Sequence, residues 1–188
     1  YPVPGTYTIR LVAIDGAGNR DTLTRVNYIT VVGQPSADFS SSVRSSCLDN
    51  NSYSFSNLST GAVSYLWDFG DGTTSTQSNP THSYAMSGVF TVTLIATNSF
   101  GCQDVEIKNT YITIFPKPDA TVQATFTSSC DPATAFQFSN NAQATSWLWN
   151  FGDGTTANQQ NPSHVFSTPG TYNVSLMATN AFGCSDTS

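Results

Sequence analysis

Short stretches in which apolar and polar residues alternate run along the whole chain, and turn-forming residues separate them. The longest regular alternation covers 89–97, where Val92, Leu94 and Ala96 occupy every second position. Successive side chains of a β-strand point to opposite faces, so a period of two predicts a strand with one buried face. The chain lacks the 3.6-residue period of an amphipathic helix. We therefore expect an all-β fold of short strands packed as a two-sheet sandwich.

A strand that leads straight into a tight turn occurs twice in the chain. Its two copies are Trp67-Asp68-Phe69-Gly70-Asp71-Gly72 and Trp149-Asn150-Phe151-Gly152-Asp153-Gly154. The Trp and the Phe of each copy share one face of the strand because they lie two residues apart. The Gly-Asp-Gly that follows tolerates positive φ and favours a turn. Large aromatic side chains before an enforced turn are typical core anchors, so we predict that both copies are structural motifs of the core.

The motif belongs to a longer internal repeat with a constant offset of 82 residues. Four features recur in the same order: Asn-Pro at 79–80 and 161–162, His at 82 and 164, Gly at 88 and 170, and Phe-Gly-Cys at 100–102 and 182–184. A partial copy opens the chain, where 5–13 matches 88–96. We therefore expect the end of one unit at 1–33 (the opening segment), a complete unit at 34–115 (the middle repeat) and a unit lacking its last strand at 116–188 (the last repeat). The sheet edge left by that strand would be open to another strand.

The order Trp-Asp-Phe-Gly-Asp-Gly, then Asn-Pro-x-His-x-Tyr, then Gly-x-Phe-x-Val-x-Leu resembles the PKD (polycystic kidney disease) domain. The resemblance covers essentially the whole chain and implies tandem immunoglobulin-like β-sandwiches. The last repeat departs from the motif at Asn150, where the middle repeat has Asp68, which argues against a strict need for that carboxylate. The short proline-containing joints at 33–35 and 115–119 predict sandwiches arranged end to end.

The composition excludes some classes of partner. The formal net charge is −6, and only six of the 188 residues are Lys or Arg, so no phosphate-binding patch and no nucleic-acid partner are expected. No apolar run is long enough to span a membrane. Solubility depends on Ser, Thr, Asn and Gln rather than on charge, as is common in secreted β-rich surface proteins.

Each repeat holds two cysteines, one near its start and one after the Phe-Gly turn: Cys47 and Cys102, then Cys130 and Cys184. Four cysteines allow three pairings. Because equivalent positions should form equivalent bonds, we predict the structural disulfides Cys47–Cys102 and Cys130–Cys184. Each would stabilise its sandwich by roughly 4 kcal/mol at most. Stable disulfides indicate an oxidising, extracellular location. The alternative, a zinc site, lacks closely spaced Cys pairs.

No residues form a recognisable catalytic set, so we predict a protein without enzymatic activity and without catalytic or cofactor-binding residues. The two histidines, His82 and His164, recur at one motif position, which favours a structural hydrogen-bonding role. A catalytic Asp71 would lack an accompanying base, nucleophile or metal cluster. The chain carries no nucleophile motif, no phosphate-binding loop and no HExxH sequence.

Calcium is a secondary hypothesis, since some PKD-like domains attached to secreted proteases bind it through loop carboxylates. The candidate ligands are Asp38, Asp49, Asp104 and Glu106, although no EF-hand spacing exists and no metal site is assigned. Aromatic residues near turns could also bind sugars. For these residues, Tyr84, Phe100 and Phe182, we prefer packing beneath the turns.

Two functions from different classes fit these observations. The first is a non-enzymatic structural or adhesive repeat region of a large bacterial cell-surface or filament-forming protein, resembling Bacteroidota-type adhesins exported by the type IX route. Its partners would be other copies of the repeat, surface proteins or polysaccharides, and it would lie at the cell surface or be secreted. The alternative is a spacer or polymer-binding accessory module of a secreted hydrolase such as a chitinase or protease. A eukaryotic membrane-protein ectodomain is a third, less favoured interpretation.

Overall fold

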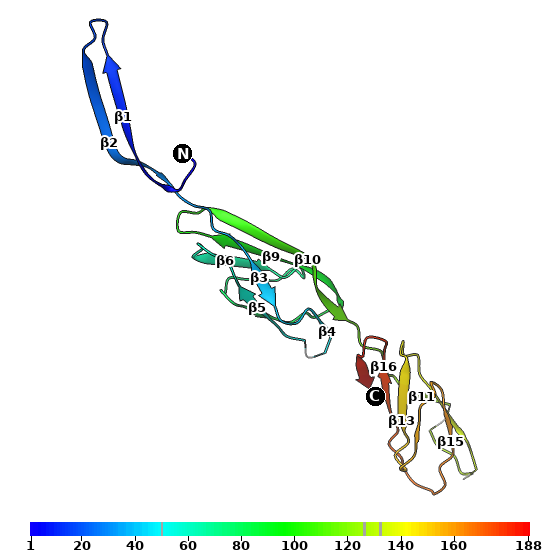
Figure 1. Ribbon diagram of the computed structural model, residues 1–188. Helices are drawn as coiled ribbons and strands as arrows, with labels where there is room; N and C mark the ends of the chain where they lie inside the picture. The colour runs from blue at the N-terminus through cyan, green and yellow to red at the C-terminus, as the bar shows by residue number, and fades with distance from the viewer. Residues whose placement is uncertain (50, 126, 132) are drawn as a thin grey trace. The chain divides into compact units, whose positions relative to one another are not determined.

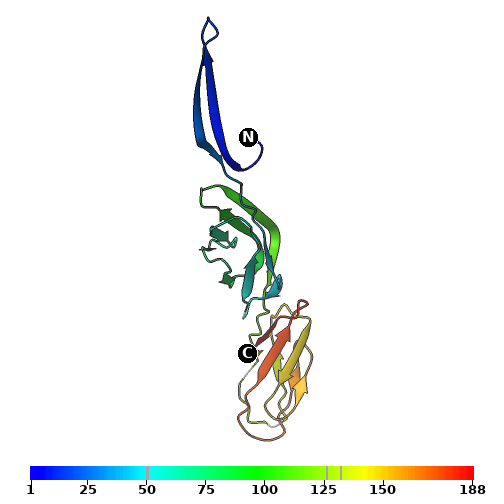
Figure 2. The ribbon, with the colours of Figure 1, turned by 60° about the vertical axis from the view of Figure 1, so that its left-hand side comes forward.

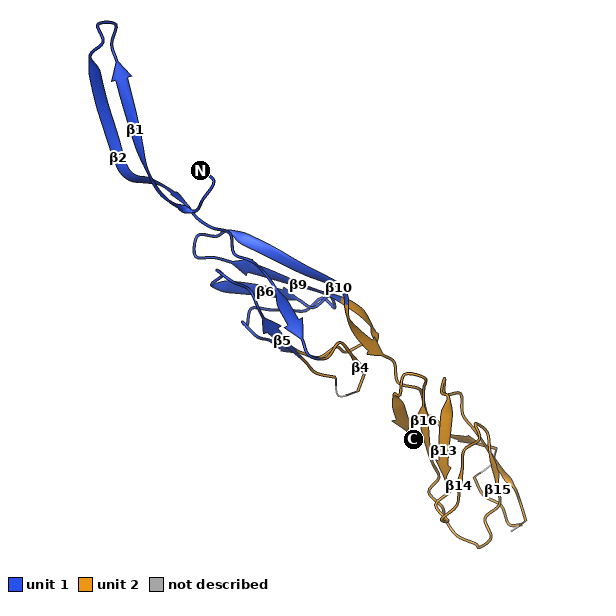
Figure 3. Cartoon of the chain, in the orientation of Figure 1, with its two compact units in different colours: residues 1–42, 54–81, 91–110 blue, residues 43–53, 82–90, 111–188 orange. Residues whose placement is uncertain are grey.

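The computed structural model describes residues 1–49, 51–125, 127–131 and 133–188. All regular secondary structure in these residues is β-strand, which confirms the predicted all-β fold. The chain divides into two units (Figure 3). Unit 1 comprises residues 1–42, 54–81 and 91–110, and unit 2 comprises 43–53, 82–90 and 111–188. The predicted domain boundaries at 33/34 and 115/116 differ from this division and stay a prediction.

The opening segment is an antiparallel hairpin of β1 (Gly5–Ile14) and β2 (Arg20–Val31) (Figure 1). The turn between them is held by Asp15, whose Oδ1 accepts hydrogen bonds from the backbone N–H groups of Ala17 and Asn19, each at 2.9 Å. Most side chains of both strands are exposed, including several large apolar ones.

Two sheets follow along the chain. A five-stranded sheet has the order β4-β10-β9-β6-β7, and a three-stranded sheet has the order β3-β5-β8. Figures 1 and 2 show β9 and β10 side by side in one layer, with β3 and β5 in the other. The strands are β3 (Phe39–Ser41), β4 (Ser45–Cys47), β5 (Tyr53–Asn57), β6 (Ser64–Asp68), β7 (Thr74–Ser75), β8 (Thr81–His82), β9 (Gly88–Thr97) and β10 (Gln103–Phe115).

The last repeat has a four-stranded sheet in the order β14-β13-β16-β17 and a three-stranded sheet in the order β11-β12-β15. Its strands are β11 (Gln123–Ala124), β12 (Phe136–Ser139), β13 (Ser146–Asn150), β14 (Thr156–Ala157), β15 (Ser163–His164), β16 (Ser175–Thr179) and β17 (Ser185–Thr187). Its buried core consists of Ala120, Phe138, Ala142, Trp149, Phe151, Leu176 and Ala178.

The two tryptophans that end the motif strands are fully buried. In unit 1 the Trp67 ring packs against Phe39 and Phe55, with centroids 5.2 and 5.6 Å apart. Its indole Nε1–H donates to the backbone carbonyl of Gln77 at 2.9 Å, and that of Trp149 donates to Gln159 at 3.0 Å. Each indole therefore fills the core and still satisfies its polar group.

The turn after each tryptophan has a glycine that no other residue can replace without strain. Gly70 and Gly152 both have φ near 80°. A Cβ on Gly70 would overlap the carbonyl oxygen of Thr91, and one on Gly152 would overlap that of Asn173. The two turns thus need glycine for both backbone conformation and close approach.

The residue before each of these turns caps it with a side-chain oxygen. Asp68 Oδ1 accepts from the N–H of Gly70 at 2.8 Å, and Asn150 Oδ1 accepts from the N–H of Gly152 at 2.9 Å. The amide oxygen of Asn150 thus makes the same hydrogen bond as the carboxylate of Asp68.

Candidate functional site

A disulfide between Cys47 and Cys184 is the main chemical feature of unit 2. Strand β4 pairs in parallel with the end of β10, so that Cys47 lies opposite Phe115. The N–H of Leu48 donates to the carbonyl of Phe115 at 3.0 Å and continues this pairing. The Cα atoms of the two cysteines are 5.5 Å apart, although 137 positions separate them in sequence. The bond thus joins the middle repeat to the last repeat.

The predicted pairs Cys47–Cys102 and Cys130–Cys184 are therefore wrong. Cys102 and Cys130 are free, with Cys102 partly buried and Cys130 exposed. Strand β10 keeps Cys47 and Cys102 apart. Cys47 pairs with Phe115, the last residue of β10, whereas Cys102 immediately precedes Gln103, its first residue. A strand of 13 residues is roughly 40 Å long, and a disulfide requires Cα atoms within about 7 Å. The one disulfide therefore joins successive repeats rather than two positions within one repeat.

The turn that carries Cys184 is organised by Asn180. Its Oδ1 accepts from the N–H groups of Phe182 and Cys184, both at 3.0 Å. Its Nδ2 donates to the carbonyl of Pro116 at 2.8 Å and so ties the turn to the joint before the last repeat. These bonds fix the backbone from Asn180 to Cys184 and so hold the sulfur in position for Cys47.

An aromatic pair and an ion-pair cluster lie close to the disulfide in the chain. The rings of Phe115 and Phe182 stack with centroids 4.3 Å apart and planes within 9°. Lys117 Nζ lies 3.3 Å from an Asp49 carboxylate oxygen and 3.1 Å from one of Asp186. The hydrogen bond to Asp186, followed by that to Asp49, raises the pKa of Lys117. Asp186 also accepts from the N–H of Ala120 at 3.0 Å, and this bond is the main cause of its lowered pKa.

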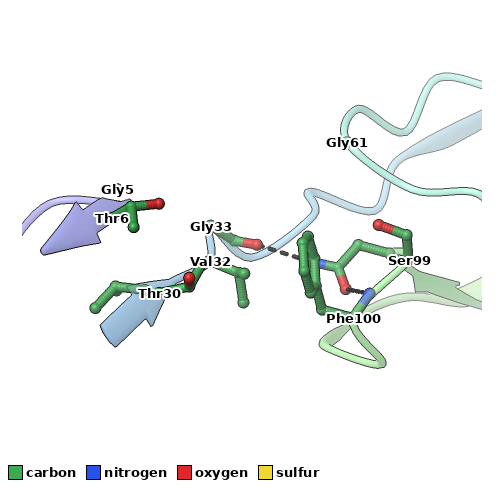
Figure 4. A pocket seen from close by; sticks show the side chains of 10 residues that line it. Gly5, Thr6, Thr30, Val32, Gly33, Gly61, Ser99 and Phe100 are labelled. Atoms are coloured by element: carbon green, nitrogen blue, oxygen red, sulfur yellow. Dashed lines mark hydrogen bonds between the residues drawn. The ribbon is translucent and has the colours of Figure 1, made fainter. Parts of the chain in front are cut away.

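The same hydrogen-bonding frame occurs in unit 1, at the joint before the middle repeat (Figure 4). Asn98 Oδ1 accepts from the N–H groups of Phe100 and Cys102, and its Nδ2 donates to the carbonyl of Gly33 at 2.8 Å. Asp104 accepts from the N–H of Ala37 at 2.7 Å, as Asp186 does from Ala120. A shallow hollow of about 370 Å³, lined in part by Val32, Gly33 and Phe100, lies beside this turn.

Sequence reasoning missed the role of Asn98 and Asn180, although their match at an offset of 82 residues was visible. The signal was a polar residue repeated just before a Phe-Gly-Cys turn, where an Asn side chain can hydrogen-bond to backbone N–H groups two and four residues later.

The aromatic residues considered for sugar binding differ in position. Tyr84 is buried and stacks on Phe90 with centroids 4.2 Å apart, as predicted. The prediction that Phe100 and Phe182 also pack beneath their turns is wrong, because 69% and 59% of their surfaces are exposed. The backbone N–H groups of both residues bond to Asn98 and Asn180, while their rings stay largely exposed.

The last repeat places its histidine in a structural hydrogen bond. His164 Nε2 lies 2.7 Å from Asp153 Oδ2, and its ring stacks on Phe151 at 4.0 Å. Asp153 also accepts from the hydroxyl and N–H of Thr155 at 2.6 and 2.9 Å. The bonds to Thr155, assisted by the one to His164, lower the pKa of Asp153 to about 2. In the middle repeat, His82 lies edge-on to Tyr84 at 4.6 Å.

The four calcium candidates are engaged with other groups. Asp38 lies 2.9 Å and Glu106 3.8 Å from Lys108, and the hydrogen bond to Lys108 lowers the pKa of Asp38. Asp104 accepts a hydrogen bond from the N–H of Ala37, and Asp49 forms an ion pair with Lys117, as described above. In the part of the chain that the structure describes, no three His, Cys, Asp or Glu side chains form a group that could hold a metal. Within the same residues, no helix is long and apolar enough to cross a membrane.

The chain matches one family in two places. The model of the PKD domain matches residues 33–114 and 115–188. Collagenase ColA of Bacillus cereus is 48% identical over 56 residues, which cover 30% of this chain and 6% of that protein. Pre-pro-metalloprotease PrtV of Vibrio cholerae is 55% identical over 42 residues, which cover 22% of this chain and 5% of that protein. The chain therefore spans only a small part of the length of these relatives.

A solved structure of a PKD domain also resembles part of this chain. The crystal structure of the PKD1 domain from Vibrio cholerae metalloprotease PrtV is 37% identical, with a TM-score of 0.37. The match covers 43% of this chain and 98% of that domain.

Proposed function

Because the chain belongs to the PKD domain family, we propose that it is a non-enzymatic extracellular structural and adhesive repeat segment of a bacterial cell-surface protein. PKD domains are non-catalytic accessory modules, which supports the non-enzymatic part of the proposal. The predicted origin in Bacteroidota, type IX export and filament formation are separate hypotheses.

The observation that carries this proposal is the Cys47–Cys184 bond. The bond encloses most of the middle repeat and nearly all of the last repeat in one covalent loop. A pulling force applied to the two ends of the chain passes from Cys47 directly to Cys184, so it cannot extend the residues between them. Such a bond protects the enclosed sandwiches from mechanical unfolding. A surface protein that is pulled by flow or by a bound partner would benefit from this protection.

The same bond supports an extracellular location. Disulfides persist in oxidising compartments and are rare in the cytosol. In the chain-entropy model, a bond across 137 positions stabilises the folded state by about 5 kcal/mol at most. The structural role therefore has a thermodynamic part as well as a mechanical part.

Single-molecule pulling on the whole chain tests the mechanical role. We expect the oxidised chain to extend only through the residues outside Cys47 and Cys184. Reduction should add the length of 137 residue steps, roughly 480 Å. Cys47→Ser should behave like the reduced chain, and Cys102→Ser, which removes a free thiol, should behave like the wild type. Full extension of the oxidised wild type would contradict the proposal.

A spacer or polymer-binding module of a secreted hydrolase is the second candidate. The identities to a collagenase and to a metalloprotease favour it, because both relatives are named as proteases. Co-sedimentation with insoluble collagen and with chitin tests this function. Saturable binding that survives physiological salt would support the accessory role, whereas binding to neither polymer would favour the structural repeat.

A further inference from the structure

In the middle repeat, the outer face of the five-stranded sheet carries exposed apolar side chains. Strand β9 lies between β6 and β10 in this sheet (Figure 1). Leu66 of β6 lies directly opposite Ile95 of β9, and 42% of the Leu66 surface is exposed. On β10, Val105 and Ile107 are 47% and 54% exposed. We call Leu66, Ile95, Val105 and Ile107 the apolar face.

The equivalent strands of the last repeat give the register that joins β10 to this face. Met177 of β16 lies opposite Thr187 of β17. These two positions match Ile95 and Val105 at the offset of 82 residues, which places Val105 beside Ile95. Residues directly opposite each other on neighbouring strands share one side of a sheet. The apolar row therefore runs across three strands, and Ile107 extends it two positions further along β10.

The polarity of β10 is the reverse of that expected for a strand with one face in water. Its exposed positions include the apolar Val105 and Ile107, while the alternating positions 104, 106 and 108 are charged and half-buried. Lys108 lies 2.9 Å from Asp38, and Asp104 accepts a backbone N–H hydrogen bond at 2.7 Å. The charged side chains are thus engaged within the repeat while the apolar ones face solvent. A contiguous apolar patch on a soluble domain marks an interaction surface.

The outer face of the other sheet is polar. On β3 and β5 its outward positions include Ser40, Ser54 and Ser56, and Ser40 lies opposite Ser56. The last repeat has an apolar pair at the positions that match Leu66 and Ile95, with Leu148 opposite Met177 and both 41% exposed. The apolar character therefore belongs to one sheet and recurs with the repeat, rather than being a general property of the surface.

The distribution of charge favours a second copy of this chain as the partner. The net charge of the chain is −6, but the outward residues of 91–97 and 103–109 are all uncharged. They are Thr91, Thr93, Ile95, Thr97, Gln103, Val105, Ile107 and Asn109. On β6, Asp68 lies at the end of the strand, where its carboxylate bonds to the N–H of Gly70. Two copies can therefore bring these faces together with little like-charge repulsion, and the outward residues of β9 and β10 include no aromatic ring on which a sugar could stack.

The size of the face suits a weak, reversible association. Strand β9 has ten residues and is roughly 33 Å long, and three adjacent strands are roughly 14 Å wide. Two such faces remove on the order of 1,000 Å² from water, which is near the lower limit for a specific protein interface.

We propose that two copies of this chain associate through the apolar faces of their middle repeats. The two sheets pack face to face, about 10 Å apart. The contact is isologous, because each copy contributes the same surface and a two-fold axis relates the copies. This inference goes beyond the proposed function and does not depend on it, because a spacer module of a hydrolase can also associate with a copy of itself.

Sedimentation of the whole chain over a range of concentrations tests the association. We expect a reversible dimer that Ile107→Lys weakens at least tenfold and that high salt does not weaken. Leu58→Lys is the matched control, since Leu58 is 52% exposed, follows β5 of the other sheet and receives the same charge. A monomer at every concentration, or equal weakening by both changes, would overturn the proposal. Binding of the monomer to collagen or chitin that Ile107→Lys abolishes would assign the face to a polymer instead, and would overturn it as well.

A more conservative variant separates loss of association from loss of folding. Val105→Thr combined with Ile107→Thr keeps β-branched side chains on the strand and removes apolar surface. We expect an unchanged thermal unfolding transition of the monomer and a dimer weakened at least threefold. An unchanged dimer in this folded variant would contradict the role of the apolar face.

Cross-linking identifies the surface that meets its own copy. The chain with Cys102→Ser and Cys130→Ser has no free thiol, so one cysteine can be added at a chosen position. Thr93→Cys places it on the apolar side of β9, and Ser54→Cys places it on the outer face of the other sheet. With a short bis-maleimide, we expect Thr93→Cys to form a covalent dimer at least tenfold faster than Ser54→Cys. Equal rates at the two positions would refute the face-to-face contact.

Discussion

The middle and last repeats share one end of their cores and differ at the other. At the motif end, the hydrogen bonds of Trp67 and Trp149 agree within 0.1 Å, as do those that Asp68 and Asn150 make to the turn. At the opposite end, the middle repeat buries its aromatic residues, whereas their counterparts in the last repeat line an open groove.

The two ends differ in the sequence separation of the residues that form them. The motif turn depends on residues within about ten positions of one another, so it forms in both repeats. In the middle repeat, the opposite end of the core includes the final residues of β10, which are far from the motif in the sequence. The motif end of the sandwich is therefore specified by local sequence, whereas the opposite end depends on contacts between distant segments.

Replacing the motif tryptophans should give the largest effects. Trp67→Ala and Trp149→Ala should each destabilise their repeat by about 3–5 kcal/mol, because both side chains are fully buried. We expect similar losses in the two repeats, because the two indoles make the same hydrogen bond and lie 5.6 Å from Phe55 and Phe138, respectively. Urea unfolding followed by near-ultraviolet circular dichroism measures both. Leu66→Ala and Leu148→Ala, at half-exposed neighbouring positions, are the controls. A much larger loss in one repeat than in the other would contradict an equivalent role of the two tryptophans.

Replacing the turn glycines should have the next largest effect and should be similar in both repeats. Gly70→Ala and Gly152→Ala combine a positive φ with backbone overlap, so each should cost more than about 2 kcal/mol. Gly72→Ala and Gly154→Ala have positive φ but open space around the Cβ, and should cost only about 1–2 kcal/mol. Thermal unfolding of the four variants checks this order. A smaller loss at Gly70 than at Gly72 would contradict the role of close approach.

Lowering the pH should destabilise the last repeat through protonation of Asp153. Its pKa is about 2 in the folded chain, below its ordinary value of 3.8, so its hydrogen bonds stabilise the fold above pH 4. This stabilisation is lost as pH falls from about 4 through about 2. Thr155→Val removes the hydroxyl donor and should raise the pKa of Asp153 part of the way toward 3.8. A carboxyl titration by NMR measures this shift, and an unchanged pKa in Thr155→Val would show that Thr155 is not its main cause.

The smallest effect should come from Lys117. Its ion pairs with Asp49 and Asp186 are exposed to solvent, so Lys117→Gln should lower the stability only slightly. The pKa of Lys117 is raised in the folded chain, so its contribution is present below pH 10.5 and is lost as pH rises above that value. Unfolding in low and high salt checks this assignment, because screening should remove the difference between wild type and variant. A difference that survives high salt would indicate packing rather than charge.

The sequence predicted the fold because the signals for it are local. Alternation along 89–97 and the motif turns identify strands and bends without reference to distant residues. The amide of Asn150 could be recognised as a substitute for the carboxylate of Asp68 for the same reason. The exposure of Phe100 and Phe182 was not predictable in this way, because it depends on how each turn meets the joint before its repeat.

The sequence by itself determined the internal repeat, the sandwich fold and the burial of the motif tryptophans, since each follows from periodicity and from residues close together in the chain. Only the tertiary structure decided which cysteines bond. Repeat symmetry permits pairing within a repeat or between successive repeats, and both options look alike in the sequence. The length of β10 and the parallel pairing of β4 with its far end place Cys47 beside Cys184, at a distance that no sequence spacing encodes.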